Sequence, residues 1–346
     1  MKLLILGGTR FLGVHLVAAA AARQHELTLF HRGSETLAEN PQVEIIHGDR
    51  NRDLAKLHGR HWDAVIDTCG YLPRHVAASA EALSAAVEQY VFISSISVYA
   101  NLSVPGIDET AAVVRLTAGQ LQEADTIDAS GPVSAATYGP LYGGLKALCE
   151  ETVQDVMPGR VLSIRSGLIA GPHDYTDRFT YWVARVARGG EVLAPAPPQR
   201  SVQFIDAGDL ADWIVDMVEH RHCGVFNASG SPSTITMKSL LESCRAVSGS
   251  DASWTWVSER FLLDEHVAPW TELPFWLPAA AMPHMGGLMA VNCQKAVAAG
   301  LRERSLDQTI GAVLRWYREE QQGRTLRAGL AEDREQQLLQ AWRNFV

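Results

Sequence analysis

The sequence has few cysteines and no clustered metal ligands. Its five cysteines are scattered over 346 residues, and no two form a Cys-x-x-Cys pair. This spacing is typical of reduced, mostly buried thiols and not of a disulfide framework or a zinc ribbon. The neighbouring histidines, His58 with His61 and His220 with His222, lack acidic or cysteine partners at ligand spacing. We therefore expect no metal site.

Long apolar runs and blocks of like charge are also missing. No apolar run approaches bilayer-spanning length, and Gly7, Gly8 and Arg10 interrupt the short N-terminal run too early for a signal peptide. The net charge of −9, without a basic block, argues against a nucleic acid or an anionic membrane as the main partner. We expect a cytoplasmic protein that has no membrane partner.

What is present is the composition of a globular protein, with 47% hydrophobic and 20% charged residues. Short apolar runs alternate with helical segments, which predicts an α/β fold built on a doubly wound parallel sheet of the Rossmann type. The expected strands are residues 3–6, 27–30, 43–46, 64–66, 90–93, 161–165 and, returning later to the same sheet, 226–228. We assign the dinucleotide-binding core to residues 1–170. A smaller C-terminal α/β substrate-binding lobe covers 171–346, and about 203–228 returns to the core.

The first expected strand runs into a glycine turn, and an apolar helix follows over about residues 11–22. In nucleotide-binding folds a pyrophosphate rests on the N-terminus of such a helix. Gly7 would make the tight turn, Gly8 would let the backbone approach phosphate, and Gly13 would let the helix pack on the strand. The predicted cofactor-binding loop is Gly7, Gly8, Thr9, Arg10, Phe11, Leu12 and Gly13.

The residues that follow the next strands are the other candidate cofactor contacts. Arg32 stands where an NAD-preferring fold has an acidic residue, and a guanidinium there can pair with a 2′-phosphate. This favours NADP, with NAD as the alternative, and Arg10 can close on the same phosphate. Asp49, followed by Arg50, can accept from the adenine amino group or cap the next helix. Gly70 would let the backbone lie near the riboses.

Hydroxyl and amino groups follow at the same expected edge of the sheet. Ser95 and Ser97 come directly after the fifth expected strand. Tyr142 and Lys146 are four residues apart, so they share one face of a helix that runs to about residue 156. In parallel sheets ligands bind beyond the carboxyl ends of the strands, which makes these four residues candidates for the reacting site.

These motifs follow one another in an order that resembles the extended short-chain dehydrogenase/reductase family, the NAD(P)-dependent epimerase/dehydratase group. The Gly-Gly-Thr-Arg-Phe-Leu-Gly form of the loop is similar to that of the atypical branch. The resemblance covers about residues 1–320. Its motifs are the loop 7–13, Ser95-Ile96-Ser97-Val98-Tyr99, Tyr142-xxx-Lys146, residues 165–172, and Gln203-Phe204-Ile205-Asp206 followed by Asp209-Leu210-Ala211.

The resemblance implies an NAD(P)-dependent oxidoreductase that transfers hydride to or from a small molecule. It makes Tyr142 the acid/base, Lys146 its electrostatic partner and cofactor-ribose ligand, and Ser95 the group that orients the substrate oxygen. Tyrosine has an ordinary pKa near ~10, and an adjacent ammonium favours the phenolate. We therefore expect Lys146 to lower the pKa of Tyr142. Ser97 is a second-choice hydroxyl.

The second half of the chain holds weaker candidates for substrate contacts. Arg178 and Tyr181 lie on an expected helix over 175–188 and can reach a substrate or simply pack the helix. The Trp- and Pro-rich segment 254–278 is either a lid or a small core under a long loop. An amphipathic tail helix over about 332–345 would dock on the body or form a homodimer. Residues 102–136, which include Gly131 and Pro132, lack clear periodicity and are expected to form a surface excursion.

Two other functions fit the same motifs. An NAD-dependent nucleotide-sugar epimerase keeps the site but returns the hydride to the substrate. A dehydratase is disfavoured, because no acidic residue stands beside Ser95. The family also contains non-catalytic relatives that sense the cofactor or bind RNA. Those commonly lose the tyrosine or the lysine, whereas Tyr142 and Lys146 are both present here.

Overall fold

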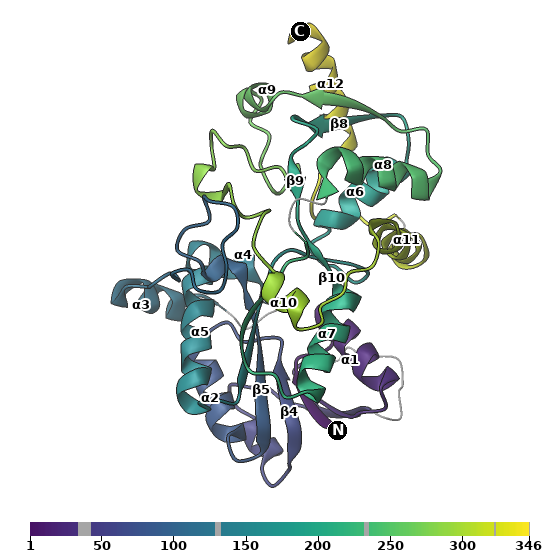
Figure 1. Ribbon diagram of the computed structural model, residues 1–346. Coiled ribbons are helices and arrows are strands. Elements are labelled where there is room, and N and C mark those ends of the chain that lie inside the picture. The colour runs from purple at the N-terminus through teal and green to yellow at the C-terminus, as the bar shows by residue number, and fades with distance from the viewer. Residues whose placement is uncertain (34–42, 129–132, 232–234, 322, 346) are drawn as a thin grey trace.

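A seven-stranded parallel sheet forms the base of the molecule (Figure 1). The computed structural model describes residues 1–33, 43–128, 133–231, 235–321 and 323–345. The strand order is β11-β6-β5-β4-β1-β2-β3, which confirms the predicted doubly wound fold. The strands are β1 (Lys2–Leu6), β2 (Glu26–His31), β3 (Val43–His47), β4 (Trp62–Asp67), β5 (Val87–Ser95), β6 (Val161–Ser166) and β11 (Gly224–Ala228).

The central strands form because their apolar runs are buried on both faces. Leu3 to Leu6 of β1 are fully buried, as expected for a strand that has helices on both sides. Leu6 is in register with Phe30 of β2 and with Asp67 of β4, and Asp67 is in register with Phe92 of β5. The carboxyl ends of β1, β2, β4 and β5 therefore meet at one edge, and the loops that follow them lie together there.

Helices cover the two faces of the sheet in pairs (Figure 1). The pair α1 (Leu12–Ala22) and α7 (Ala207–Glu219) packs on one face, and its core includes Leu16, Trp213 and Ile214. The pair α2 (Pro73–Leu83) and α5 (Tyr142–Val156) packs on the other face, around Tyr90 and Phe92. Among the described residues, no helix has the length and apolar character needed to cross a membrane.

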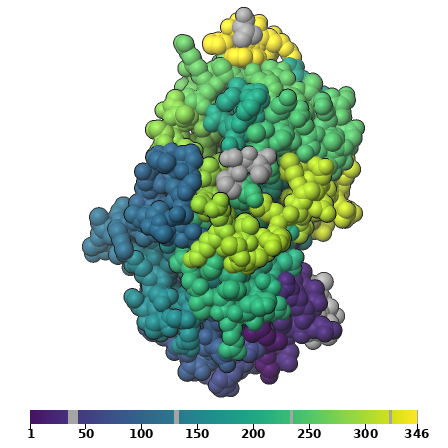
Figure 2. Space-filling model, in the orientation of Figure 1, coloured from purple at the N-terminus to yellow at the C-terminus, as the bar shows by residue number. Residues whose placement is uncertain are grey.

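The rest of the chain forms a lobe above the carboxyl edge of the sheet, with its own apolar core. In Figure 2 the yellow-green segment that contains α10 lies across the junction between the lobe and the sheet. The lobe and its connections contain β7 (Ile169–Ala170), α6 (Arg178–Ala187), β8 (Glu191–Pro195), β9 (Ser201–Val202), β10 (Ile205–Asp206), β12 (Ile235–Thr236), α8 (Met237–Ser248), β13 (Ser253–Val257), α9 (Glu259–Asp264), α10 (Gln294–Ala298), α11 (Leu306–Trp316) and α12 (Glu332–Phe345).

The excursion after β5 contains a helix that the sequence analysis did not identify. This helix is α3 (Ala118–Thr126), which begins at a capping box formed by Thr117 and Gln120. Only Ala124 of this helix is buried, so the sequence carried no apolar stripe to reveal it. A second short helix, α4 (Ala135–Tyr138), leads into α5. Gly131 and Pro132 lie outside the described residues.

The tail helix α12 docks on the body of the same chain. Glu335 is 2% exposed, forms an ion pair of 2.5 Å with Arg185 of α6, and accepts a hydrogen bond from the backbone N–H of Leu193. Leu338 and Leu339 pack into the core of the lobe. Arg188 also contacts Glu335, at 3.4 Å, so a buried carboxylate with three partners fixes the position of α12.

Replacing Glu335 tests this anchor. Glu335→Gln leaves the buried Arg185 guanidinium without a counter-ion, which should lower the free energy of unfolding by about 3 kcal/mol. Glu332→Gln is the matched control: it breaks the exposed pair of Glu332 with Arg188 on the same helix and should change stability by under about 1 kcal/mol. Denaturant unfolding of both variants measures the difference. Equal losses would contradict a buried anchor at Glu335.

Candidate active site

A cavity of about 870 Å³ opens at the carboxyl edge of the sheet, between the sheet and the lobe. The glycine loop, the segments after β2 to β5, the start of α5 and part of the lobe line it. Most sequence-predicted site residues are among its lining: Gly7, Gly8, Thr9, Arg10, Phe11, Leu12, Gly13, Arg32, Asp49, Arg50, Ser95, Ser97, Tyr142, Lys146 and Arg178. The structure therefore brings residues from both halves of the chain to one place.

The glycine loop has the geometry that a phosphate cradle requires. Gly7 and Gly8 have φ of +96° and +91°, which side-chain-bearing residues rarely adopt. A Cβ on Gly13 would lie 2.6 Å from the Cα of Gly8, so the start of α1 can approach the loop only with glycine there. The first turn of α1 has neither a capping side chain nor an acidic residue. Its backbone N–H groups are suited to an anion, and these residues fit a dinucleotide pyrophosphate.

The two arginines expected to share one phosphate lie on different sides of the cavity. The guanidinium of Arg10 lies over the ring of Tyr175, 4.3 Å from its centroid, toward the lobe. Arg32 lies near Asp49, with 3.9 Å between Nη1 and a carboxylate oxygen. The Asp49 side chain also accepts from the backbone N–H of Asn51. Arg10 thus faces the lobe, which the sequence did not indicate.

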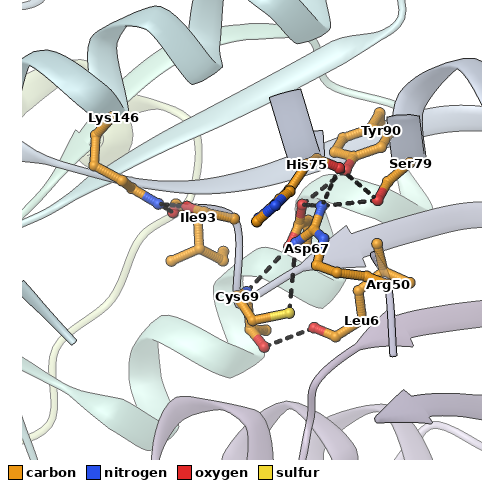
Figure 3. A network of polar contacts seen from close by, with 11 residues as sticks. Leu6, Arg50, Asp67, Cys69, His75, Ser79, Tyr90, Ile93 and Lys146 are labelled. Atoms are coloured by element: carbon orange, nitrogen blue, oxygen red, sulfur yellow. Dashed lines mark hydrogen bonds and ion pairs between the residues drawn. The ribbon is translucent and has the colours of Figure 1, made fainter. Parts of the chain in front are cut away.

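Arg50 is held in a buried network beneath the cavity (Figure 3). Its two terminal nitrogens each donate to one oxygen of Asp67 at 2.8 Å, and one also donates to Ser79. The Tyr90 hydroxyl donates to the same carboxylate at 2.8 Å. Burial alone would raise the pKa of Asp67, but the Arg50 guanidinium and these hydrogen bonds lower it overall. Most N–H groups of the Arg50 guanidinium therefore already donate hydrogen bonds to other groups of the protein.

Lys146 is nearly fully buried, and its ammonium is bound by the main chain. The Nζ atom donates to the carbonyl oxygens of Gly70 at 2.7 Å and Ile93 at 2.5 Å (Figure 3). It also lies 4.1 Å from the ring centroid of Phe92 and 5.3 Å from that of Tyr71. An ammonium has three N–H donors, so one remains for a ligand. Gly70, which the sequence analysis placed near the cofactor riboses, packs against Phe92. It is not among the described residues that line the cavity.

Tyr142 is the first residue of α5, and its phenol lies beside Ser95. Burial raises the pKa of Tyr142 to about 12, although a hydrogen bond with the Ser95 side chain opposes the shift. The expected lowering by Lys146 does not occur in this structure, because the ammonium is directed to the two carbonyl groups. The phenol is therefore protonated at neutral pH.

The two serines form a small turn at the end of β5. The Ser95 Oγ accepts from the backbone N–H of Ser97 at 3.1 Å and donates to the Ser97 hydroxyl at 3.2 Å. The turn begins the 3₁₀ segment Ile96–Val98 and fixes the Ser95 hydroxyl next to Tyr142. Ser95 is thus positioned by its own backbone turn.

Four aromatic residues lie near the site, and two of them, Tyr71 and Tyr175, were not assigned to it by the sequence analysis. Tyr71 stacks on Tyr138, with ring centroids 5.7 Å apart, and lies 6.2 Å from the ring of Tyr142. Tyr175 and Trp270 line the cavity on the side of the lobe. These four side chains come from loops and short helices, where no periodic pattern announces them.

Of the two weaker candidates for substrate contacts, the structure places Arg178 at the cavity and Tyr181 away from it. Arg178, at the start of α6, lines the cavity and lies over Trp270, with 5.2 Å between guanidinium and ring centroid. Tyr181 is buried against Trp182 and is not among the described residues that line the cavity. Nearby Asp174 is 1% exposed, and burial raises its pKa to about 6.

The comparisons with known proteins identify the family. The model of the NAD dependent epimerase/dehydratase family matches residues 3–229, which is more than half of the chain. The chain therefore belongs to this family. Membership confirms the resemblance seen in the motifs and the expectation of an NAD-dependent enzyme.

One curated relative is the chloroplast stem-loop binding protein of 41 kDa b of Arabidopsis thaliana, which is 26% identical over 267 residues. The match covers 72% of this chain and 63% of that relative, so this chain spans less than two thirds of the relative's length.

Similar solved structures include the UDP-glucuronic acid 4-epimerase of Bacillus cereus in complex with NAD, with a TM-score of 0.64 and 16% identity over 95% of this chain and 100% of that chain. The UDP-Glc/GlcNAc 4-epimerase of Campylobacter jejuni has a TM-score of 0.66 and 16% identity, and the match covers 92% of this chain and 99% of that chain. At these identities the structures show that the fold is shared.

Proposed function

We propose that the chain catalyses NAD(P)-dependent hydride transfer at a carbonyl or carbinol carbon of a small molecule. The observation that carries this proposal is the position of Tyr142 and Ser95. Their hydroxyl groups lie together in the cavity into which the glycine loop and the start of α1 also open. A proton-transferring group and a cradle for the dinucleotide thus share one enclosed space.

The glycine loop and the N-terminus of α1 would hold the pyrophosphate, and Lys146 has one N–H available for the nicotinamide ribose. A nicotinamide nucleotide, when bound, supplies or accepts the hydride. Arg32, at the carboxyl end of β2, is the residue that would pair with a 2′-phosphate. We therefore propose NADP as the preferred form.

The protonation state of Tyr142 suits a proton donor. With a pKa of about 12 the phenol keeps its proton at neutral pH and can donate it to a carbonyl oxygen as that oxygen gains charge. Ser95 can donate a second hydrogen bond to the same oxygen and so polarise the carbonyl. The reverse direction needs a phenolate, which the buried site disfavours.

A nucleotide-sugar epimerase is the second candidate, and the fold comparisons favour it. The solved structures from Bacillus cereus and Campylobacter jejuni are sugar-nucleotide epimerases that match over nearly the whole chain. An epimerase would use Tyr142 in both directions and consume no cofactor overall. Net oxidation of NADPH with a carbonyl substrate distinguishes a reductase from an epimerase. Stem-loop binding without turnover would instead make the chain similar in function to the plant relative, which is named a stem-loop binding protein.

Tyr142→Phe tests the assignment of the proton donor. The phenyl ring keeps the packing against Tyr71 but removes the hydroxyl group, so turnover should fall by at least about 10²-fold, the usual contribution of a general acid. Fluorescence titration with NADPH should show nearly unchanged cofactor affinity. Tyr138→Phe is the matched control, since its ring stacks on Tyr71 one helical turn earlier in the chain. Full activity of Tyr142→Phe would remove Tyr142 from the mechanism.

Arg32→Ala tests the proposed cofactor preference. Loss of a charge-assisted contact to the 2′-phosphate should weaken NADP binding by about tenfold or more and leave NAD binding nearly unchanged. Dissociation constants for both nucleotides measure the ratio. Arg52→Ala, which removes an arginine from the segment after β3, controls for the general loss of positive charge. Equal weakening of NADP and NAD by Arg32→Ala would refute the contact.

A further inference from the structure

The guanidinium of Arg178, which is partly exposed at the cavity wall, is placed differently from those of three more deeply buried arginines. Arg50, Arg165 and Arg185 each form an ion pair with a buried carboxylate, at 2.8, 2.8 and 2.5 Å. Among the described residues, no carboxylate lies within ion-pair distance of Arg178, which rests on Trp270 instead. Even partial burial of a cation without a counter-ion is costly. This feature persists in folded proteins mainly where a ligand completes the site.

Of the two acidic residues nearest to Arg178 in sequence, Asp177 is occupied by other groups, whereas Asp174 leaves its Oδ2 without a hydrogen-bond partner and attracts Arg178 from beyond ion-pair distance. Asp174 accepts from the backbone N–H and hydroxyl of Thr176 through the same oxygen. Asp177 binds the side chain of Arg324 and the backbone N–H of Arg327. Neither carboxylate forms an ion pair with Arg178, although both are buried. The positive charge therefore remains available at the cavity wall.

On the side of the lobe the cavity has an apolar stretch, although Tyr175, Thr176 and Gln203 also line the cavity. The stretch is formed by one tryptophan, two leucines and three methionines, whose only strong hydrogen-bonding group is the indole N–H. These residues are Trp270, Leu277, Met282, Met285, Leu288 and Met289. A sugar with several hydroxyl groups would lose its hydrogen bonds to water on this stretch and gain few in return. An aromatic or alkyl body would fit it, because methionine side chains adapt to apolar shapes.

From these observations we propose that Arg178 binds the carboxylate or phosphate of a substrate whose body is apolar and packs on Trp270 and the methionines. The inference rests on the proposed function for the reacting end of that substrate, near Tyr142. It sets the substrate class apart from the sugar nucleotides of the structural relatives. Arg10, stacked on Tyr175 at the same side of the cavity, adds positive charge at the entrance.

Calorimetric titration of the NADP⁺-saturated protein tests this inference. The anionic probes are benzoate, 3-phenylpropanoate, octanoate and phenyl phosphate. Each carboxylate is compared with its neutral amide, and phenyl phosphate is compared with phenol. UDP-glucose is the sugar-nucleotide probe. We expect at least one anion to bind about tenfold or more tightly than its neutral counterpart, as a charge-assisted pair requires. Comparing the three carboxylates with phenyl phosphate shows whether the site prefers a carboxylate or a phosphate group.

Variants then assign the binding to Arg178. Arg178→Met should reduce the affinity of the anion to that of its neutral counterpart, and Arg178→Lys should retain part of it because the charge remains. Arg188→Gln, an exposed arginine at the end of the same helix, is the matched control and should leave binding unchanged. Thermal unfolding of each variant verifies that it is folded.

Three results would overturn the inference: equal binding of an anion and its neutral counterpart, undiminished binding in folded Arg178→Met, or UDP-glucose, itself a diphosphate anion, binding more tightly than every anion that has an apolar body. Absence of binding by all four anions at millimolar concentration would overturn it as well. Hydride transfer is measured separately, as NADPH oxidation with carbonyl compounds. Anion binding through Arg178 without any turnover would refute the proposed function and leave the anion site in place.

Discussion

The site depends on one buried ammonium group. Lys146 reaches from α5 to the carbonyl oxygens of Gly70 and Ile93, which belong to the chain after β4 and to β5. These two hydrogen bonds attach the helix to the carboxyl edge of the sheet. Tyr142 lies one helical turn earlier on the same helix, so the anchored lysine also sets where the phenol lies relative to Ser95.

A second buried cation stabilises the same edge from below. Arg50 joins the chain after β3 to Asp67 at the end of β4, and Tyr90 of β5 binds the same carboxylate. In the low dielectric of this region the paired charges are held firmly, whereas a lone phenolate is disfavoured. The surroundings that fix Lys146 and Arg50 are thus also the reason that Tyr142 keeps its proton. Among the described residues no carboxylate lies within ion-pair distance of Arg178, which lies over Trp270 at the cavity wall instead.

The sequence predicted the parts of the site that local patterns encode. The glycine loop, the strand segments of a doubly wound sheet and the shared helical face of Tyr142 and Lys146 were predicted from local patterns, and the structure places the loop, Tyr142 and Lys146 at one edge of the sheet. The sequence did not predict which side chains and backbone groups from distant segments would contact one another. Nothing in the sequence showed that Lys146 would bind two carbonyl groups or that Arg10 would turn toward Tyr175. Likewise, the apolar stretch on the side of the lobe comes from a segment without helical or strand periodicity.

The central claim is that the carbonyl groups, and not the phenol, take up the charge of Lys146. Carbon-13 NMR of tyrosine labelled at Cζ, with Tyr142→Phe to assign the signal, measures the ionisation of Tyr142 in the cofactor-free protein. The pKa of about 12 predicts that the signal of Tyr142 is still that of a neutral phenol at a pH near ~10, where an ordinary tyrosine is half ionised. A midpoint well below that pH would mean that the ammonium acts on the phenol directly, and would contradict the account.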